Sequence, residues 1–236
     1  MAAIATPSAD EVIPSPNIWR FPDVYELENQ AVDPDGVIEH TMQEIRPWTG
    51  AAVLDIGCGA GFHLPRFAAT ARSVVGVEPH RGLAARSTRR VRKLRNVSVV
   101  NGSAQRLPLE DSSVDVAHAR WAYFFGPGCE AGLSELARVM RPGGVAFVID
   151  NDATRSTFGR WFQRSLPAYD QEQVDAFFAR RGWEALRREI SWQFESRSDL
   201  EAVARIEFSP VLAEQILAEH DGTYVDYAIT IRVRRY

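Results

Sequence analysis

Short apolar runs alternate with amphipathic stretches between residues 51 and 150. The apolar runs predict strands at residues 51–56, 73–77 (ending at Glu78), 97–100, 114–119 and 145–149. Helices are predicted at 64–71 and 81–94, and a third where one helix face would carry Leu133, Leu136, Ala137 and Met140. A turn is expected at residues 141–144. Strands that alternate with helices of this length indicate a parallel sheet covered on both faces.

The pattern is weaker on either side of this core. Beyond residue 150 we expect a helix at 170–181, a strand at 188–194, one or two helices within 198–220 and a final strand at 223–233. The two late strands would complete a Rossmann-like, doubly wound, seven-stranded and mostly parallel sheet with helices on both faces. Residues 17–48 are polar and aromatic, with a helix expected at 35–45. Prolines among small residues predict a flexible arm at residues 1–16.

The composition is typical of an ordinary globular protein, with 45% of the 236 residues hydrophobic and 25% charged. The formal net charge of −4 argues against broad coating of nucleic acid. Two cysteines, Cys58 and Cys129, cannot build a disulfide framework, which fits a reducing compartment. No apolar run approaches the roughly 20 residues of a membrane span, and no signal-peptide profile is present. We therefore expect a soluble, cytoplasmic protein without a membrane partner.

A glycine cluster follows the first predicted strand. The run 53–61, VLDIGCGAG, places three glycines at a strand-to-helix turn, where the lack of a Cβ lets the backbone approach a ligand. Glu78 follows about 20 residues later, where a carboxylate can accept hydrogen bonds from both hydroxyls of a ribose. A dinucleotide-binding turn would read G-x-G-x-x-G/A, but Phe62 stands at its last position. Asp55, just before the glycines, would suit a cationic ligand better than a pyrophosphate.

From residue 51 to residue 150 the chain resembles the class I S-adenosylmethionine-dependent methyltransferases of the small type 11 kind. The resemblance implies that the loop 55–61 surrounds the methionine part of S-adenosyl-L-methionine and that Glu78 binds its ribose. Residues 102–104 (GSA) and 107–108 (LP) match a loop that contacts adenine, and 138–144 (RVMRPGG) match the turn before the fifth strand. Ser103 replaces a common aspartate, so it would bind the adenine amino group through a weaker hydrogen bond.

The resemblance implies a set of cofactor-binding residues: Tyr25, Asp55, Gly57, Cys58, Gly59, Glu78, Pro79, Gly102, Ser103, Ala104 and Arg120. Tyr25 resembles the lid tyrosines that close over the cofactor. Arg120, just past the fourth strand, either pairs with the cofactor carboxylate or forms a structural ion pair. Cys58 is interpreted as a packing residue, because no motif surrounds it with an activating base. His80 either flanks adenine or lies at the surface. The five histidines lack metal-ligand spacing, so no metal is expected.

The same resemblance implies a single methyltransferase domain over residues 17–236. It would consist of an N-terminal lid (17–48), a cofactor-binding core (51–150) and an acceptor-side segment with the final strands (151–236). An aromatic cluster after the fourth strand either lines an apolar acceptor pocket or packs in the core: Trp121, Tyr123, Phe124 and Phe125.

A sulfonium cofactor carries its own leaving group, so the protein must mainly align the reacting atoms and exclude water. No catalytic residue is assigned, although Asp150, Asn151, Asp152 and His63 stand where a base would act. We expect in-line methyl transfer to a small-molecule acceptor, with secondary metabolites among the candidates, and release of S-adenosyl-L-homocysteine. The alternatives are an RNA or protein acceptor, and a cofactor-binding protein without transferase activity. The sequence identifies neither the acceptor, nor the methylated element, nor the oligomeric state.

Overall fold

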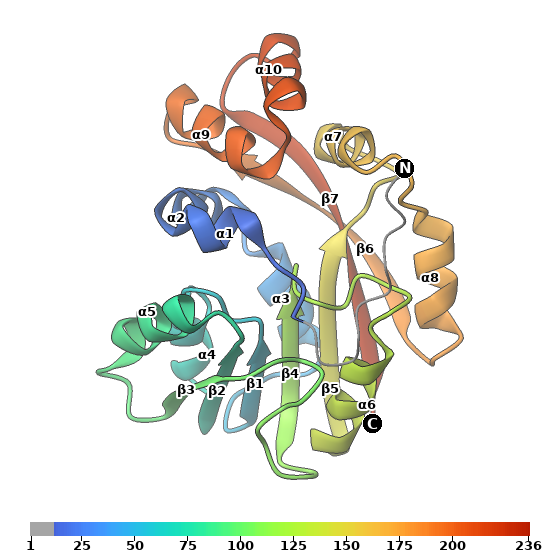
Figure 1. Cartoon of the computed structure of the whole chain (residues 1–236). Coiled ribbons are helices and arrows are strands. Elements are labelled where there is room, and N and C mark those ends of the chain that lie inside the picture. Colours follow the sequence, from blue (N-terminus) through green and yellow to red (C-terminus); the bar gives the residue numbers. More distant parts are fainter. Residues whose placement is uncertain (1–11) are drawn as a thin grey trace.

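The computed structural model describes residues 12–236, so most of the predicted arm (residues 1–11) lies outside the described part. Its centre is a seven-stranded sheet in the order β3-β2-β1-β4-β5-β7-β6 (Figure 1). The strands are β1 (Ala52–Ile56), β2 (Ser73–Glu78), β3 (Val97–Asn101), β4 (Val114–Arg120), β5 (Met140–Asn151), β6 (Glu184–Gln193) and β7 (Tyr224–Arg235). β1 to β5 pair in parallel, and β7 runs antiparallel to both β5 and β6. The predicted Rossmann-like, mostly parallel sheet is confirmed.

Helices lie on both faces of the sheet and beyond its carboxyl end. They are α1 (Pro16–Arg20), α2 (Pro22–Ala31), α3 (Val37–Ile45), α4 (Leu64–Ala68), α5 (Arg81–Val91), α6 (Glu130–Val139), α7 (Thr157–Ser165), α8 (Gln171–Ala179), α9 (Arg197–Glu207) and α10 (Pro210–Glu219). Figure 1 shows α1, α2, α7, α9 and α10 gathered at the end toward which β4 and β5 point. None of the helices in the described part is long and apolar enough to cross a membrane.

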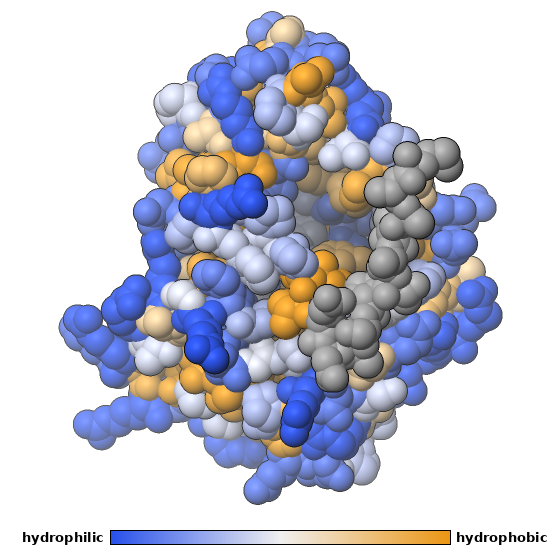
Figure 2. Space-filling view, viewed as in Figure 1, coloured by the Kyte–Doolittle hydropathy of each residue, from blue (hydrophilic) through white to orange (hydrophobic). Residues whose placement is uncertain are grey.

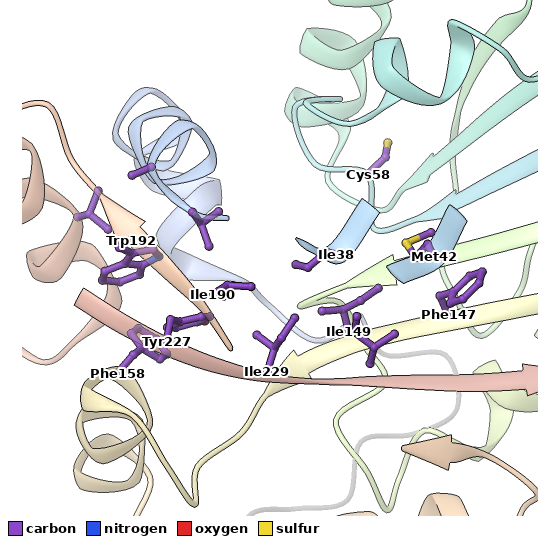
Figure 3. Packing of buried hydrophobic residues seen from close by; sticks show 14 of the residues in the cluster. Ile38, Met42, Cys58, Phe147, Ile149, Phe158, Ile190, Trp192, Tyr227 and Ile229 are labelled. Atoms are coloured by element: carbon purple, nitrogen blue, oxygen red, sulfur yellow. The ribbon is translucent and has the colours of Figure 1, made fainter. Parts of the chain in front are cut away.

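Two apolar cores cover the two faces of the sheet. Val53 and Phe147 belong to one core, which also contains side chains of α3 and α4, whereas Leu54 and Val148 belong to another with side chains of α6 and α8. Successive strand residues thus alternate between buried faces, which explains why the strands appear in the sequence as continuous apolar runs. Figure 3 shows part of the first core, with Met42 beside Phe147 on β5.

The structure corrects the predicted elements at several places. Helices α1, α2 and α7 were not expected, and Pro16, predicted in the arm, starts α1, where its fixed φ suits the first turn. Met140 was expected on a helix face but begins β5, because it pairs with Val114 before an irregularity in the β4–β5 register. The residues predicted to form a turn therefore lie within a bulged strand. β6 begins at Glu184, earlier than expected, because its polar first half pairs along β7.

The segment predicted as a lid packs on the late part of the chain. Helix α2 contacts α9 and β6, and α3 contacts β6. The predicted helix at 35–45 is confirmed as α3, whose N-terminus is held by the carboxylate of Asp33, which accepts hydrogen bonds from the Val37 and Ile38 N–H groups. These contacts place α1 and α2 over the carboxyl ends of the central strands. Opening and closing of the segment remains a prediction.

Candidate functional site

A cavity of about 740 Å³ lies at the carboxyl ends of the parallel strands. Its walls come from the turn after β1, the end of β2, the loops after β3 and β4, the end of β5, and residues of α1, α2, α7 and α9. Figure 2 shows the corresponding hollow on this face of the molecule. Ligands of open α/β sheets bind at this edge, and small-molecule sites typically measure about 300–1,000 Å³. Position and size therefore mark the cavity as the candidate site.

Ten of the eleven predicted cofactor-binding residues line this cavity: Tyr25, Gly57, Cys58, Gly59, Glu78, Pro79, Gly102, Ser103, Ala104 and Arg120. They come from helix α2 and from four separate strand ends or loops. Since parallel strands bring their carboxyl ends to one edge of the sheet, the fold gathers residues that are far apart in the sequence.

Asp55 is the predicted residue that does not line the cavity. Its side chain is buried on β1, and its Oδ1 lies 2.8 Å from Nδ1 of His118 on the neighbouring strand β4. The two residues face each other in the β1–β4 register. Asp55 Oδ2 has no hydrogen-bond partner among the described residues. In this structure Asp55 joins two strands beneath the glycine turn.

The glycine turn is tied to the end of β2. The N–H groups of Gly57 and Cys58 donate to the Val77 carbonyl, at 2.8 and 3.2 Å. The Gly59 N–H donates to Glu78 Oε2 at 2.9 Å, and the His80 N–H donates to Oε1 of the same carboxylate. Burial raises the pKa of Glu78, while these two donors lower it. The carboxylate is thus fixed at the cavity wall.

Glycine is required twice in this turn. Gly57 and Gly59 have φ angles of +71° and +55°, a region that side chains with a Cβ rarely adopt. A Cβ on Gly57 would lie 2.5 Å from the Ala122 Cβ, and one on Gly59 would lie 2.8 Å from Ile18 Cδ1. Both residues must therefore be glycine for the turn to take this shape and to pack this closely on Ala122 and Ile18.

Arg120 presents a buried cation without a counter-ion. Its Nε and Nη2 atoms are buried and have no hydrogen-bond partner, and no carboxylate in residues 12–236 lies within 4.0 Å of the guanidinium. The guanidinium lies 4.4 Å from the ring centroid of Trp121, and burial lowers the Arg120 pKa. The structural ion pair that the sequence left open thus has no partner in this part of the chain. An anionic ligand group would satisfy these donors.

Trp19 of α1 contributes an aromatic ring to the cavity wall. Trp19 and His80 stack with their ring centroids 4.8 Å apart, and His80 Nδ1 caps α5 by accepting from the Leu83 N–H. Trp19 lines the cavity, as do the residues of the loop after β3, where Gly102 packs closely on Pro108. This arrangement offers a flat apolar surface next to backbone groups, which suits a purine ring.

The end of the cavity between β5, α2 and α9 carries carboxyl groups. Glu28 of α2 and Glu207 of α9 share a hydrogen bond, and Asn17 donates to Glu207 Oε1. Burial raises the pKa of Glu28 well above its usual range, and Glu207 raises it further. Asp150 lies near the end of β5, and burial raises its pKa to about 6. Beside it, Asn151 Oδ1 accepts hydrogen bonds from Trp121, which follows β4, and from Tyr227 of β7.

Three of the four residues considered as bases line the cavity. Asp150, Asn151 and His63 do so, whereas Asp152 is fully buried with its Oδ2 3.5 Å from both Arg155 and Arg187. Burial, with Arg120 and His118 nearby, lowers the pKa of His63 well below its usual value. His63 is therefore neutral at physiological pH.

Cys58 is buried, and burial raises its thiol pKa, as expected for a packing residue.

Several cavity residues were not anticipated from the sequence. Glu28 lies three positions after Tyr25, on the same side of α2, so helical spacing from a suspected lid tyrosine could have indicated it. Trp19, Glu207 and Tyr227 stand in no motif, and only the packing of α1, α9 and β7 brings them to the cavity.

The residues present fit an adenosyl amino acid. The carboxylate of Glu78 suits the hydroxyls of a ribose, and the unpartnered guanidinium of Arg120 suits a carboxylate. The glycine backbone allows the amino-acid chain to come close, and the ring of Trp19 suits a purine. The fold and the cavity thus define an α/β enzyme for a nucleoside-type cofactor.

Comparisons with known proteins agree with this class. Residues 54–148 match the family described as "Methyltransferase domain". A demethylmenaquinone methyltransferase of Staphylococcus saprophyticus is 24% identical over 158 residues, which are 59% of this chain and 68% of that enzyme. Residues 54–148 therefore carry a methyltransferase domain, a family that implies S-adenosylmethionine as the methyl donor.

Solved structures share the fold at low sequence identity. The YcgJ protein from Bacillus subtilis has a TM-score of 0.62 and 17% identity, over 84% of this chain and 97% of that chain. A geranyl diphosphate methyltransferase in complex with SAM has a TM-score of 0.55 and 16% identity, over 84% of each chain. Both likenesses concern the architecture of the sheet and its helices.

The raised pKa of Glu28 makes stability depend on pH. The folded protein holds a proton that the unfolded chain has lost, so stability should fall as pH rises from about 4.5 through the raised pKa. The charged and titratable groups around this carboxyl are Glu207, Arg120 and Tyr25, and the charge of Arg120 lowers the Glu28 pKa. Glu28→Gln should flatten the fall of the unfolding midpoint between pH 5 and 8, each kcal/mol corresponding to about 2–4 °C.

Ligand-free thermal unfolding across this pH range checks the prediction. Glu172→Gln, at an exposed position on α8, is the matched control and should keep the wild-type slope. Parallel pH profiles for wild type and Glu28→Gln would contradict it.

Proposed function

We propose that this methyltransferase acts on a small, largely apolar acceptor that enters the cavity beside the lid. The observation that carries the proposal is the apolar mouth of the cavity. Of the large apolar residues that are exposed in the described part, four line the cavity: Val12, Ile13, Phe125 and Leu166. An exposed apolar group around a concave site is typical of a binding site for an apolar ligand.

We further propose how the chain holds its cofactor. Glu78 would accept hydrogen bonds from the ribose hydroxyls, Arg120 would pair with the methionine carboxylate, and Trp19, which stacks on His80, would contact the adenine. Tyr25 lies on α2 near Arg120, where it would cover the methionine part. When bound, S-adenosylmethionine supplies an activated methyl group on a sulfonium leaving group.

The chain's own contribution is placement and exclusion of water. Trp121 and Tyr227 are fixed from two strands, because Trp121 Nε1 and the Tyr227 hydroxyl both donate to Asn151 Oδ1, at 2.8 and 2.6 Å. They stand at the cavity wall between the glycine turn and Asp150. Rigid aromatic walls of this kind orient an acceptor for in-line attack and keep water out.

RNA and protein acceptors find less support. Arg120 is the sole arginine or lysine among the described cavity-lining residues, so no basic collar surrounds the mouth. Two relatives carry the names of methyltransferases for demethylmenaquinone and geranyl diphosphate, which are small acceptors. The family match also favours an enzyme over a cofactor-binding protein without activity.

Methyl-labelled S-adenosylmethionine tests this proposal. The protein is incubated with the labelled donor and a solvent extract of the cells that make it, or with bulk RNA, or with unfolded cellular protein. We expect label in the organic phase. Leu166→Glu, at the mouth, should lower transfer at least about tenfold because it places a charge against the apolar acceptor. Val211→Glu, equally apolar, exposed and outside the cavity, is the control. Label confined to RNA or protein would contradict the proposal.

The two carboxylates near the glycine turn should differ in cofactor binding. Glu78→Gln should weaken S-adenosylhomocysteine binding at least about tenfold, because it removes a charged acceptor from the cavity wall. Asp55→Asn should change the affinity less than about threefold, since Asp55 is turned to His118 and lies outside the cavity lining. Titration calorimetry measures both, with thermal unfolding to confirm folding. An equal or larger loss for Asp55→Asn would place Asp55 on the cofactor instead.

A further inference from the structure

Three carboxyl groups stand at the acceptor end of the cavity. Glu28, Asp150 and Glu207 come from α2, β5 and α9, and all three line the cavity. Two of them are buried with an oxygen that has no hydrogen-bond partner: Glu28 Oε2, in a residue 8% exposed, and Asp150 Oδ2, in a residue 3% exposed. Leaving such groups unpaired costs free energy, so the unpaired oxygens point to a ligand with hydrogen-bond donors.

The charges of the cavity do not balance. Its described lining holds four carboxyl groups, of which Glu78 faces the proposed ribose position, and one guanidinium, Arg120, assigned to the methionine carboxylate. No arginine, lysine or histidine of residues 12–236 lies within 4.0 Å of the carboxyls of Glu28, Asp150 or Glu207. The charge of Arg232 acts on Asp150, but its ion pair, at 2.9 Å, is with Asp175, and its Nε and Nη1 atoms have no hydrogen-bond partner. The carboxyl groups of Glu28, Asp150 and Glu207 therefore have no ion-pair partner among the described residues.

Aromatic rings stand among these carboxyl groups. Phe158 and Tyr227 also line the cavity, with their ring centroids 3.9 Å apart, and the charges of Glu28, Glu207 and Asp150 all act on Tyr227. Figure 3 shows these two rings together, next to Trp192. Electron-rich ring faces attract cations, and they do so most strongly in desolvated sites. Carboxylates and aromatic faces together favour a positively charged nitrogen over a neutral or anionic group.

We propose that the acceptor is an apolar amine, held as its ammonium form by Glu28 and Asp150 against the aromatic rings. This inference rests on the proposed function and names the substrate class of the same site. The apolar part of the amine would extend to the mouth at Phe125 and Leu166. Glu207 shares a hydrogen bond with Glu28 and acts as a positioning residue for it.

The reaction that follows is balanced. An ammonium nitrogen has no lone pair, so it first passes one proton to a carboxylate, for which Asp150 is placed, with Tyr169, Tyr227 and Arg232 around it. The nitrogen lone pair then forms the new N–C bond while the S–C bond breaks. The electron pair of that bond stays on sulfur, and the N-methylated product leaves as an ammonium.

A matched set of three probes tests the proposal: 4-phenylbutylamine, 4-phenylbutan-1-ol and 4-phenylbutyrate. Each is titrated by calorimetry into the protein saturated with S-adenosylhomocysteine at pH 7.5. We expect the amine to bind at least about tenfold more tightly than the alcohol, as charge-assisted hydrogen bonds predict, and the carboxylate to bind least. Equal binding of amine and alcohol, or tighter binding of the carboxylate, would overturn the proposal. This comparison needs no variant.

Variants of the carboxyl residues test which side chains cause the preference for the amine. Glu28→Gln and Asp150→Asn should each reduce the preference for amine over alcohol at least about threefold, whereas Glu172→Gln on the exposed side of α8 should keep it. If the variants instead weaken S-adenosylmethionine more than S-adenosylhomocysteine and leave the amine preference intact, the carboxyls serve the sulfonium and the inference fails. A protein that does not bind S-adenosylhomocysteine at all would contradict the proposed function itself, which separates the two failures.

Discussion

The hydrogen bond from the Gly59 N–H to the Glu78 carboxylate is the contact on which the site depends. It joins the turn after β1 to the end of β2, next to the two N–H groups that donate to the Val77 carbonyl. The turn can take this shape only with positive φ at Gly57 and Gly59. One interaction thus fixes a close backbone approach and a carboxylate at the same wall, which is the chemistry that an adenosyl cofactor needs.

The late part of the chain completes the cavity from the other side. Because β7 returns antiparallel between β5 and β6, α9 comes to lie over the carboxyl ends of the strands and packs on α2. Glu28 and Glu207 meet there although they are far apart in the sequence. Buried polar groups without partners are destabilising, at about 1–3 kcal/mol each, and Glu28, Asp150 and Arg120 carry such atoms at the cavity wall.

The sequence predicted what local chemistry specifies. Continuous apolar runs identified the central strands, and the glycine run and Glu78 both lie at the wall of the cavity. It missed the short helices α1, α2 and α7, although α7 carries its apolar residues on one face. It also predicted Asp55 among the cofactor-binding residues, whereas the side chain faces His118 and lies outside the cavity lining. Glu207 and Tyr227 could not be found, because their place depends on how β7 and α9 pack, and no spacing along the chain encodes that contact.

A crystal structure of the complex with S-adenosylhomocysteine measures the central claim most directly. The ribose hydroxyls should lie within hydrogen-bond distance of the Glu78 carboxylate, and the homocysteine carboxylate should contact the guanidinium of Arg120. The sulfur should then face the end of the cavity that holds Glu28 and Asp150. A ligand whose sulfur faces Trp19 and His80, or whose carboxylate avoids Arg120, would contradict this division of the cavity into a cofactor end and an acceptor end.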